Sequence, residues 1–180
     1  MRTWLALSVM CLAAVVAVDG QRAGGAAAAA GPTMTIETAK GTIEILFYAS
    51  DAPKSVAHIV GLAKRNFYRG QRVHRVEASL VQFGDRVTRD GSRRDSWGRS
   101  GSGTPIGEAE FNKHSHVRGA VSLAHSGNPR NADSQMFIMK TNMSGLDGKH
   151  VVIGRVTRGM DVVDKLQYAD LFKQVTVTEP

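Results

Sequence analysis

Short runs of β-branched and apolar residues, separated by turn residues, fill the sequence from residue 34 onward and limit the folds open to it. Runs of about four to eight such residues bounded by Gly, Asn, Asp or Ser are typical of β-strands. They occupy residues 34–38, 42–48, 72–76, 80–83, 119–124, 135–140, 151–156 and 175–178. Residues 39–41 join the first two runs as a hairpin, because Gly41 can take positive φ without strain. The pattern predicts a mainly β domain, either a closed barrel or a sandwich.

Two stretches have helical spacing instead. In the first, apolar residues recur at i, i+3, i+4 and i+7 and so share one helix face: Val56, Ile59, Val60 and Ala63. Pro53 suits the first turn of this helix, where no N–H is needed, and Ser50 or Asp51 is expected to cap it. The second stretch is residues 160–166. We expect both helices to lie at the ends of the barrel or sandwich.

Residues 1–20 have the pattern of an export signal. Arg2 precedes an uncharged, mostly apolar run of 15 residues, 4–18. This run is too short to span a bilayer, which needs about 20 residues, so we expect a secretory signal peptide cleaved after Ala17 or Gly20. The alternative is an uncleaved membrane anchor. With cleavage the protein is exported, to the periplasm or the medium, and keeps no stable membrane insertion.

Behind this signal we expect a flexible Ala/Gly-rich spacer at 21–33 and one domain at 34–178. A domain of roughly 150 residues buries about 68–70% of its unfolded surface and can fold without staples. The single cysteine, Cys11, lies inside the expected signal, so after cleavage the protein would have no cysteine and could form no disulfide. Lys and Arg number 23 against 16 Asp and Glu, a net charge of +7 that favours anionic partners but is uninformative about fold.

Three stretches carry the motifs that point to a function. In chain order they are NFY (66–68) with VHRV (73–76) and LVQFGD (80–85); GAVSLA (119–124) with ADSQMFI (132–138); and LDGKHVVIG (146–154). In this order and spacing they resemble the cyclophilin family of peptidyl-prolyl cis-trans isomerases, over about residues 34–177. The resemblance implies a closed, eight-stranded antiparallel β-barrel capped by two α-helices, with a proline-binding groove on its outer face.

The resemblance also implies roles for nine residues. Arg75 corresponds to the catalytic arginine, and Gln82 to the glutamine that binds the substrate backbone. The proline pocket comprises Leu80, Phe137, Leu146 and His150, with Ala124, His125 and Gln135 beside it. The expected substrates are proline-containing segments of unfolded or exported polypeptides. We expect the protein to act as a monomer, without a cofactor or metal, and to bind no nucleic acid.

Several positions depart from the family pattern. Residues 77–79 read Glu-Ala-Ser where the family usually has one more residue and a pocket phenylalanine. Val73 and Phe83 replace a phenylalanine and a glycine, and Gly145 stands where many members have an aromatic residue that contacts the drug cyclosporin. We therefore predict weak cyclosporin binding, and a second function stays open: a catalytically weak binding module or holdase for proline-containing segments.

Other patterns are weaker. His114 and His116 near Glu110 match no metal-ligand signature, and zinc needs three or four ligands. Residues 98–107 are glycine-rich but lack the Gly-Lys-Ser/Thr ending of a phosphate loop. The arginines of residues 86–99 lie among aspartates, which favours a solvated loop over a nucleic-acid patch. A polyanion-binding surface driven by the +7 charge remains a third possibility.

A hydrolase has little support in the sequence. Ser122, Ser134 and His125 follow no nucleophile-elbow pattern.

Overall fold

The computed structural model describes Met1 and residues 31–180, so the expected signal peptide and most of the expected spacer lie outside the described residues. The strands are β1 (Thr33–Thr38), β2 (Gly41–Phe47), β3 (Arg75–Val76), β4 (Leu80–Phe83), β5 (Ala120–Leu123), β6 (Met136–Met139), β7 (Val152–Arg158) and β8 (Gln174–Thr178). The α-helices are α1 (Pro53–Lys64) and α2 (Met160–Lys165). Short 3₁₀ helices are η1 (Arg86–Arg89), η2 (Gly91–Ser96), η3 (Pro129–Asn131) and η4 (Ser144–Leu146). In the described part, no helix is long and apolar enough to span a bilayer.

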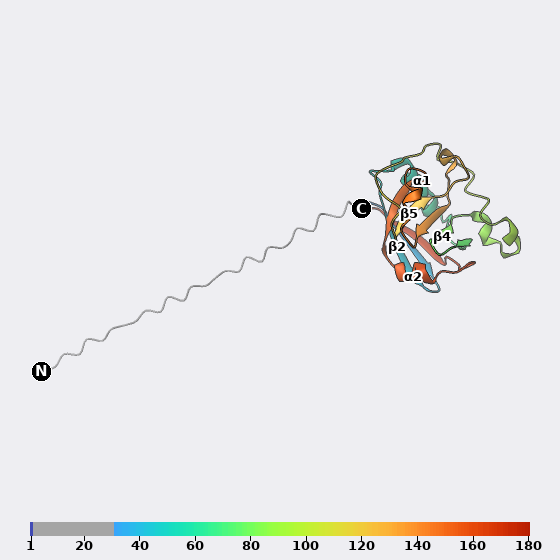
Figure 1. Cartoon of the computed structure of the whole chain (residues 1–180). Coiled ribbons are helices and arrows are strands. Elements are labelled where there is room, and N and C mark those ends of the chain that lie inside the picture. The colour runs from blue at the N-terminus through green and yellow to red at the C-terminus, as the bar shows by residue number, and fades with distance from the viewer. Residues whose placement is uncertain (2–30) are drawn as a thin grey trace.

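All eight strands form one antiparallel sheet with the order β3-β4-β6-β5-β7-β2-β1-β8. The sheet curls around its apolar face, and Figure 1 places α1 toward the top of the domain and α2 at its bottom. The mainly β prediction, the two helices and the β1–β2 hairpin are confirmed. The strand runs read from the sequence agree with the observed strands to within a few residues.

The expected closed barrel is not confirmed, because the sheet has two ends, β3 and β8. β3 contains only two residues, too few to continue a ladder to β8. Instead, segment 70–73 approaches segment 169–172 through the isolated bridge between Arg72 and Leu171. Backbone bonds flank that bridge, among them the Phe172 N–H to the Gln71 carbonyl at 2.9 Å. The architecture is an open, curled sheet whose edges are joined by irregular chain.

The main core lies inside the curled sheet and under α1. Alternate residues of β1 and β2 point inward and are buried, including Met34, Ile36, Ile43 and Ile45. Phe83, the residue that replaces a family glycine, packs edge-on against Phe172 with ring centroids 4.9 Å apart. A bulky side chain at that position is therefore accommodated as core.

The first turn of α1 is capped differently from the prediction. The N-cap is Ala52, and neither Ser50 nor Asp51 supplies a side-chain cap. The carboxylate of Glu110 instead accepts hydrogen bonds from the backbone N–H groups of Lys54 and Ser55, at 2.9 and 2.7 Å. A residue distant in sequence thus satisfies the orphan donors that every helix start presents.

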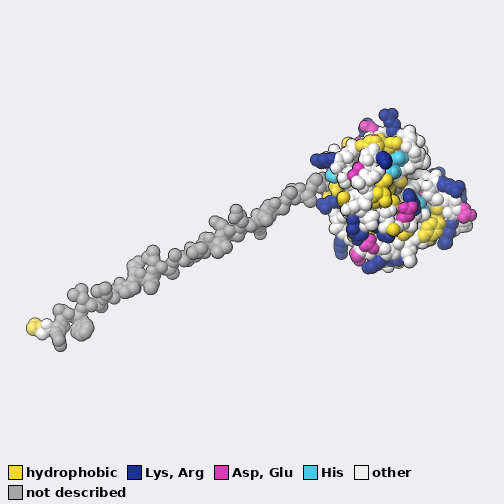
Figure 2. All heavy atoms as spheres, in the orientation of Figure 1, with side chains coloured by type: hydrophobic (Ala, Val, Ile, Leu, Met, Phe, Trp, Pro, Cys, Tyr) yellow, Lys and Arg dark blue, Asp and Glu magenta, His cyan; other side chains and the backbone are white. Residues whose placement is uncertain are grey.

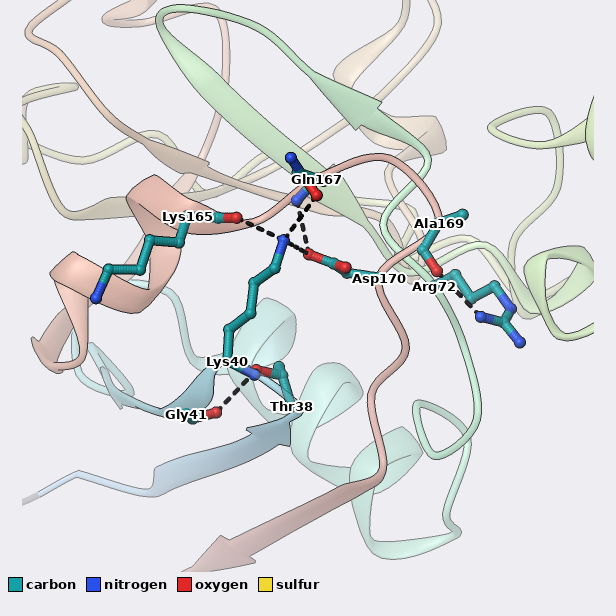
Figure 3. A network of polar contacts seen from close by, with 8 residues as sticks. All are labelled: Thr38, Lys40, Gly41, Arg72, Lys165, Gln167, Ala169 and Asp170. Carbon is teal, nitrogen blue, oxygen red and sulfur yellow. Dashed lines mark hydrogen bonds and ion pairs between the residues drawn. The ribbon is translucent and has the colours of Figure 1, made fainter.

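Lys40, in the turn between β1 and β2, donates hydrogen bonds to the chain at the end of α2 and beyond it (Figure 3). Its ammonium lies 2.7 Å from the carbonyl oxygen of Lys165 and 2.7 Å from Oδ2 of Asp170. The same oxygen of Asp170 accepts from the backbone N–H of Gln167 at 2.7 Å. These contacts hold the loop between α2 and β8 against the hairpin.

The arginine-rich segment is ordered by its own contacts. The side chains of Asp85 and Asp90 cap η1 and η2. Arg89 donates to backbone carbonyls of residues 66, 67 and 69, and Arg94 lies over the Trp97 ring. On the face seen in Figure 2, basic side chains are spread among acidic ones and do not gather in one patch.

Candidate active site

A row of paired residues crosses four strands on the outer face of the sheet. Arg75 on β3 pairs with Gln82 on β4, Gln82 pairs with Phe137 on β6, and Phe137 pairs with Ser122 on β5. Directly paired residues in a sheet project their side chains on the same face. The pairing therefore brings the guanidinium, the amide and the aromatic ring together, whereas Val81, Ile138 and the alternate residues point into the main core.

A second apolar cluster lies on this outer face, separate from the main core. Leu80, Phe137, Met139, Ala120 and Val152 are its buried members. Tyr48, Ala124, Met143 and Leu146 pack against it and are partly exposed. A ligand on the outer face would therefore contact these partly exposed members first, with the edges of Leu80 and Phe137 beneath them. We call this cluster, with Arg75, Gln82 and His150 at its border, the outer site.

The polar side of the outer site is a chain of hydrogen bonds that begins at Arg75. Its Nη1 donates to Oε1 of Gln82 at 3.1 Å, and Nε2 of Gln82 donates to Oε1 of Gln135 at 2.8 Å. Nε2 of Gln135 then donates to the carbonyls of Gly98 and Ser100, at 2.9 and 2.8 Å. A glutamine amide has an oxygen that accepts and a nitrogen that donates, so each bond in this chain sets the orientation of the next amide. Gln82 consequently presents its oxygen to Arg75 and its nitrogen to Gln135.

One buried group, Asp85, and one partly buried group, His74, support that chain. Oδ2 of Asp85, which has no exposed surface, accepts from the N–H of Gly98 at 2.6 Å. His74 lies beside Gln135, with its Nε2 at 3.1 Å from Oε1 of that residue. Burial lowers the pKa of His74, so its imidazole is neutral near pH 7 and Nε2–H acts as the donor. Neither residue was among the sequence-predicted site residues, although both lie in the quoted motifs.

Two imidazoles form the other border of the outer site. His150 meets the Phe137 ring edge-on with centroids 5.2 Å apart, and His125 stacks on His150 at 4.3 Å. Nδ1 of His150 donates to the carbonyl of Leu123 at 3.0 Å. Burial lowers the pKa of His150, and the neighbouring His125, His116 and Arg75 add to the shift. The ring is therefore neutral near pH 7. Its proton is on Nδ1, and Nε2 is the unprotonated nitrogen.

His116, which sequence reasoning treated only as a weak metal candidate, supports Phe137. Its ring is buried and nearly parallel to the Phe137 ring, with centroids 6.0 Å apart. Nδ1 lies 2.7 Å from Oδ1 of Asp147, and Nε2 lies 3.0 Å from the hydroxyl of Ser122. The bond from His116 lowers the pKa of the Asp147 carboxyl. Ser122 has no exposed surface, so this Ser-His-Asp arrangement cannot present a nucleophile to a substrate.

The other members of the weak metal pattern lie apart from His116. His114 stacks on Tyr48 at 4.0 Å and contacts Asp51 at 3.0 Å, while Glu110 caps α1. Within residues 31–180, no three His, Cys, Asp or Glu side chains come together as a metal would require.

A cavity of about 600 Å³ adjoins the outer site. Gln82, Ala124, His125 and Gln135 line one side, and residues 98–101 with Asp133 line much of the other. All nine sequence-predicted site residues thus belong to the outer site or line this cavity. An extended peptide on the outer site would have room for a neighbouring side chain here.

The departure at residues 77–79 forms a tight turn between β3 and β4. The Glu77 N–H donates to the Leu80 carbonyl at 2.8 Å, and Ala78 is exposed. Phe137 and Tyr48 are the aromatic members of the outer cluster, and the turn contributes none. The turn therefore adds no aromatic side chain to the outer cluster, and Leu80, which follows the turn, is an aliphatic member of that cluster.

Comparison with known proteins gives one consistent family. The family model for "Cyclophilin type peptidyl-prolyl cis-trans isomerase/CLD" matches residues 33–180. A peptidyl-prolyl cis-trans isomerase of Helicobacter pylori is 36% identical over 144 residues, 78% of this chain and 83% of that protein. Peptidyl-prolyl cis-trans isomerase B of Bacillus subtilis is 35% identical over 136 residues, 75% of this chain and 90% of that protein.

A solved structure matches the fold as well. A cyclophilin type peptidyl-prolyl cis-trans isomerase of Cryptosporidium parvum, crystallised in the presence of the dipeptide Ala-Pro, has a TM-score of 0.70 at 19% identity. The match covers 82% of this chain and 99% of that one.

Proposed function

Because the chain belongs to the cyclophilin-type peptidyl-prolyl cis-trans isomerase family, we propose that its outer site binds X–Pro segments and catalyses their cis-trans isomerisation. The observation that carries this proposal is the row Arg75, Gln82, Phe137, in which a cationic donor, a polar positioner and an aromatic surface are paired strand to strand. That set of groups meets the two needs of the reaction, a grip on the proline ring and a donor for the twisting amide.

The reaction requires no covalent step. Rotation about an amide breaks its resonance, with a barrier of about 18–20 kcal/mol, and uncatalysed X–Pro exchange takes roughly 10–100 s. As the bond twists, the prolyl nitrogen becomes pyramidal and gains a lone pair. A guanidinium that donates a hydrogen bond to this lone pair binds the twisted form more tightly than either planar isomer, which lowers the barrier.

The magnitudes are consistent with this small set of groups. An acceleration of about 10⁴ requires ~5.5 kcal/mol, at ~1.36 kcal/mol per tenfold. One preorganised donor in a water-poor site contributes roughly 2.7–4 kcal/mol, and better packing of the twisted form in the pocket supplies the remainder. Arg75 is the donor in this mechanism. Lysine would be weaker, because it lacks the planar fork that two partners can hold.

The remaining site residues hold the substrate. Gln82 binds the peptide backbone while it contacts Arg75. The pocket for the proline ring consists of Leu80, Phe137, Leu146 and His150. Ala124, His125 and Gln135 form the border toward the adjoining cavity, where the residue next to the proline is accommodated.

A second function is favoured by one observation: the shortened 77–79 turn contributes no aromatic side chain to the outer cluster. With weaker pocket contacts to the twisted proline, the protein would hold proline-containing segments without accelerating exchange appreciably. An exchange assay separates the two functions. We expect purified protein to increase the cis-trans exchange rate of a short X–Pro peptide, measured by exchange NMR, in proportion to protein concentration. Binding with no change in exchange rate would favour the holdase.

The substrates on this proposal are exported polypeptides, since residues 1–20 have the pattern of a secretory signal. We propose export to the periplasm or the medium and action as a monomer. Mass spectrometry of the protein recovered from these compartments tests this, because cleavage after Ala17 or Gly20 leaves a defined N-terminus. An intact Met1 on membrane-bound protein would favour the anchor instead.

A further inference from the structure

Glu77 contacts the proposed catalytic arginine from the turn that departs from the family pattern. Its Oε1 lies 2.8 Å from Nε of Arg75 and 2.7 Å from Nη2. One carboxylate oxygen thus accepts from two nitrogens of the same guanidinium. The site residues implied by the family resemblance include no acidic residue at this place. From the sequence alone, residues 77–79 indicate only the loss of a pocket phenylalanine.

The contact leaves part of the guanidinium available to a substrate. A guanidinium carries five N–H groups in one plane. Two of those of Arg75 are directed to Glu77 and one on Nη1 to Gln82. Among residues 31–180 these are the hydrogen-bond partners of the Arg75 side chain, so one N–H on Nη1 and one on Nη2 remain for a ligand.

We propose that Glu77 is a positioning residue, which fixes the guanidinium of Arg75 in the plane from which it donates to the prolyl nitrogen. The inference rests on the proposed isomerase function. The Arg75 side chain is 50% exposed, so it samples many rotamers unless it is held. Gln82 alone holds one N–H and allows rotation about that bond. Glu77 adds a second, charged partner on a different part of the fork and removes that freedom.

A fixed donor is what the chemistry needs. Donors that are already oriented stabilise the transition state without reorganising as the reaction proceeds. When a bound peptide covers the outer site, water leaves the pair, and the attraction between Glu77 and Arg75 strengthens in the lower dielectric. Because the prolyl nitrogen gains its lone pair only as the amide twists, the effect of Glu77 is expected in the twisted state more than in ground-state binding.

The Glu77 side chain is not needed to build the turn. The turn is closed by backbone bonds: the Glu77 N–H to the Leu80 carbonyl, and the Lys140 N–H to the Ser79 carbonyl at 2.7 Å. Lys140 Nζ also contacts the backbone carbonyl of Glu77, which any substitution retains. Exposed ion pairs contribute little to stability, so replacing this side chain should leave the fold intact.

The test compares kcat and KM of the wild type with Glu77→Ala and Glu77→Gln. We expect Glu77→Ala to lower kcat about tenfold with little change in KM, because orientation of the donor matters mainly in the transition state. Glu77→Gln retains the Oε1 atom that accepts both N–H groups but loses the charge, so its kcat should lie between those of the wild type and Glu77→Ala. The matched control is Glu44→Ala, which breaks the exposed Glu44–Arg158 pair at 3.2 Å and should behave as wild type.

A readout independent of activity accompanies the kinetics. In the wild type and Glu77→Gln, the Arg75 Nε–H should give a resolved NMR signal with slow solvent exchange, which Glu77→Ala should lose. Equal kcat in wild type and Glu77→Ala would overturn the inference and leave the isomerase function standing. A higher kcat in Glu77→Ala would also overturn it and make Glu77 a restraint. An inactive wild type would overturn the proposed function, and the inference with it.

Discussion

Arg75 and Gln82 face each other across the β3–β4 pair, and the guanidinium Nη1 of Arg75 donates to Oε1 of Gln82 over 3.1 Å. The bond links the proposed donor to a hydrogen-bond chain that continues through Gln135 into the backbone of residues 98–100. The donor is thus linked to β4, to the residue that precedes β6 and to one loop. This relationship explains why side chains far from the amide should affect its rotation.

Gln82→Ala should lower kcat/KM by about 10- to 100-fold, because it removes both the backbone contact to the peptide and one anchor of Arg75. The side chain lies on the outer face, so the circular dichroism spectrum should stay unchanged. Steady-state exchange kinetics with a short X–Pro peptide measure the effect. An unchanged kcat/KM would mean that the peptide does not lie along β4.

Phe137→Ala should abolish measurable proline binding and destabilise the domain by about 3–5 kcal/mol, the usual cost of truncating a buried aromatic residue. Phe137 is 3% exposed and packs between Leu80, His150 and His116. Phe137→Leu keeps most of the volume and should retain the fold while weakening the peptide affinity. Calorimetric titration with the peptide, together with urea unfolding, separates binding from stability. Wild-type affinity in Phe137→Leu would contradict an aromatic surface for the ring.

Activity should fall as the pH drops below about 6.5, the ordinary value for histidine. The pKa of His150 is lowered by burial, with His125, His116 and Arg75 facing it, so the neutral ring persists at pH 7 and gains a proton only below that ordinary value. Protonation puts a second positive charge beside Arg75 and the proline pocket. His150→Gln should flatten this acid limb of the kcat/KM profile. An acid limb that survives in His150→Gln would assign it to another group.

Folding stability should change in the same pH range with the same sign. Below pH 6.5 the unfolded chain protonates His150 more readily than the folded chain does, so stability falls as the pH falls toward the lowered folded pKa. His74 has a lowered pKa too and adds a parallel contribution. Comparing urea unfolding of wild type and His150→Gln at several pH values isolates the part due to His150, since both retain His74.

Lys40→Met should destabilise the domain by about 1–2 kcal/mol, because it removes charge-assisted bonds to Lys165 and Asp170 that are only partly exposed to solvent. Methionine keeps the length and apolar stem of the side chain. Equilibrium urea unfolding gives the change. Stability equal to wild type would mean that the loop after α2 is held by its other contacts.

Cyclosporin should inhibit the wild type only weakly, at concentrations above micromolar. Gly145 lies in η4 where many family members have an aromatic residue, and a Cβ added there would meet open space. Gly145→Trp should therefore fit without strain and increase the affinity for the drug about tenfold, as an added aromatic contact of about 1.5 kcal/mol would. Sub-micromolar inhibition of the wild type would contradict the prediction.

Much of the fold could be read from the sequence because it depends on local pattern. The alternating residues of β1 and β2, the turn at Gly41 and the stripe of α1 need no distant partner to be recognised. Contacts between remote segments were the ones missed. The cap of α1 comes from Glu110 in a long loop, and the edges of the sheet meet through Arg72 and Leu171 without a ladder.

The site divides in the same way. The family resemblance named Arg75, Gln82 and Phe137, and the strand register places these three on one face of the sheet. The supports of that site did not stand out, because their signal exists only in three dimensions. The role of His116 follows from its contacts with Asp147 and Ser122. The role of Glu77 follows from its contact with an arginine two residues away, whose side-chain orientation the sequence does not specify.

The most direct test of the account is the cis-trans exchange rate of a short X–Pro peptide with wild-type protein, Arg75→Ala and Arg75→Lys at matched concentrations. We predict clear acceleration of exchange by the wild type and loss of most of this acceleration in Arg75→Ala. Arg75→Lys should retain a small part of the acceleration, and all three proteins should be folded. Equal acceleration by wild type and Arg75→Ala would contradict the assignment of Arg75 as the donor. No acceleration by any of the three would leave the protein a binding module for proline-containing segments.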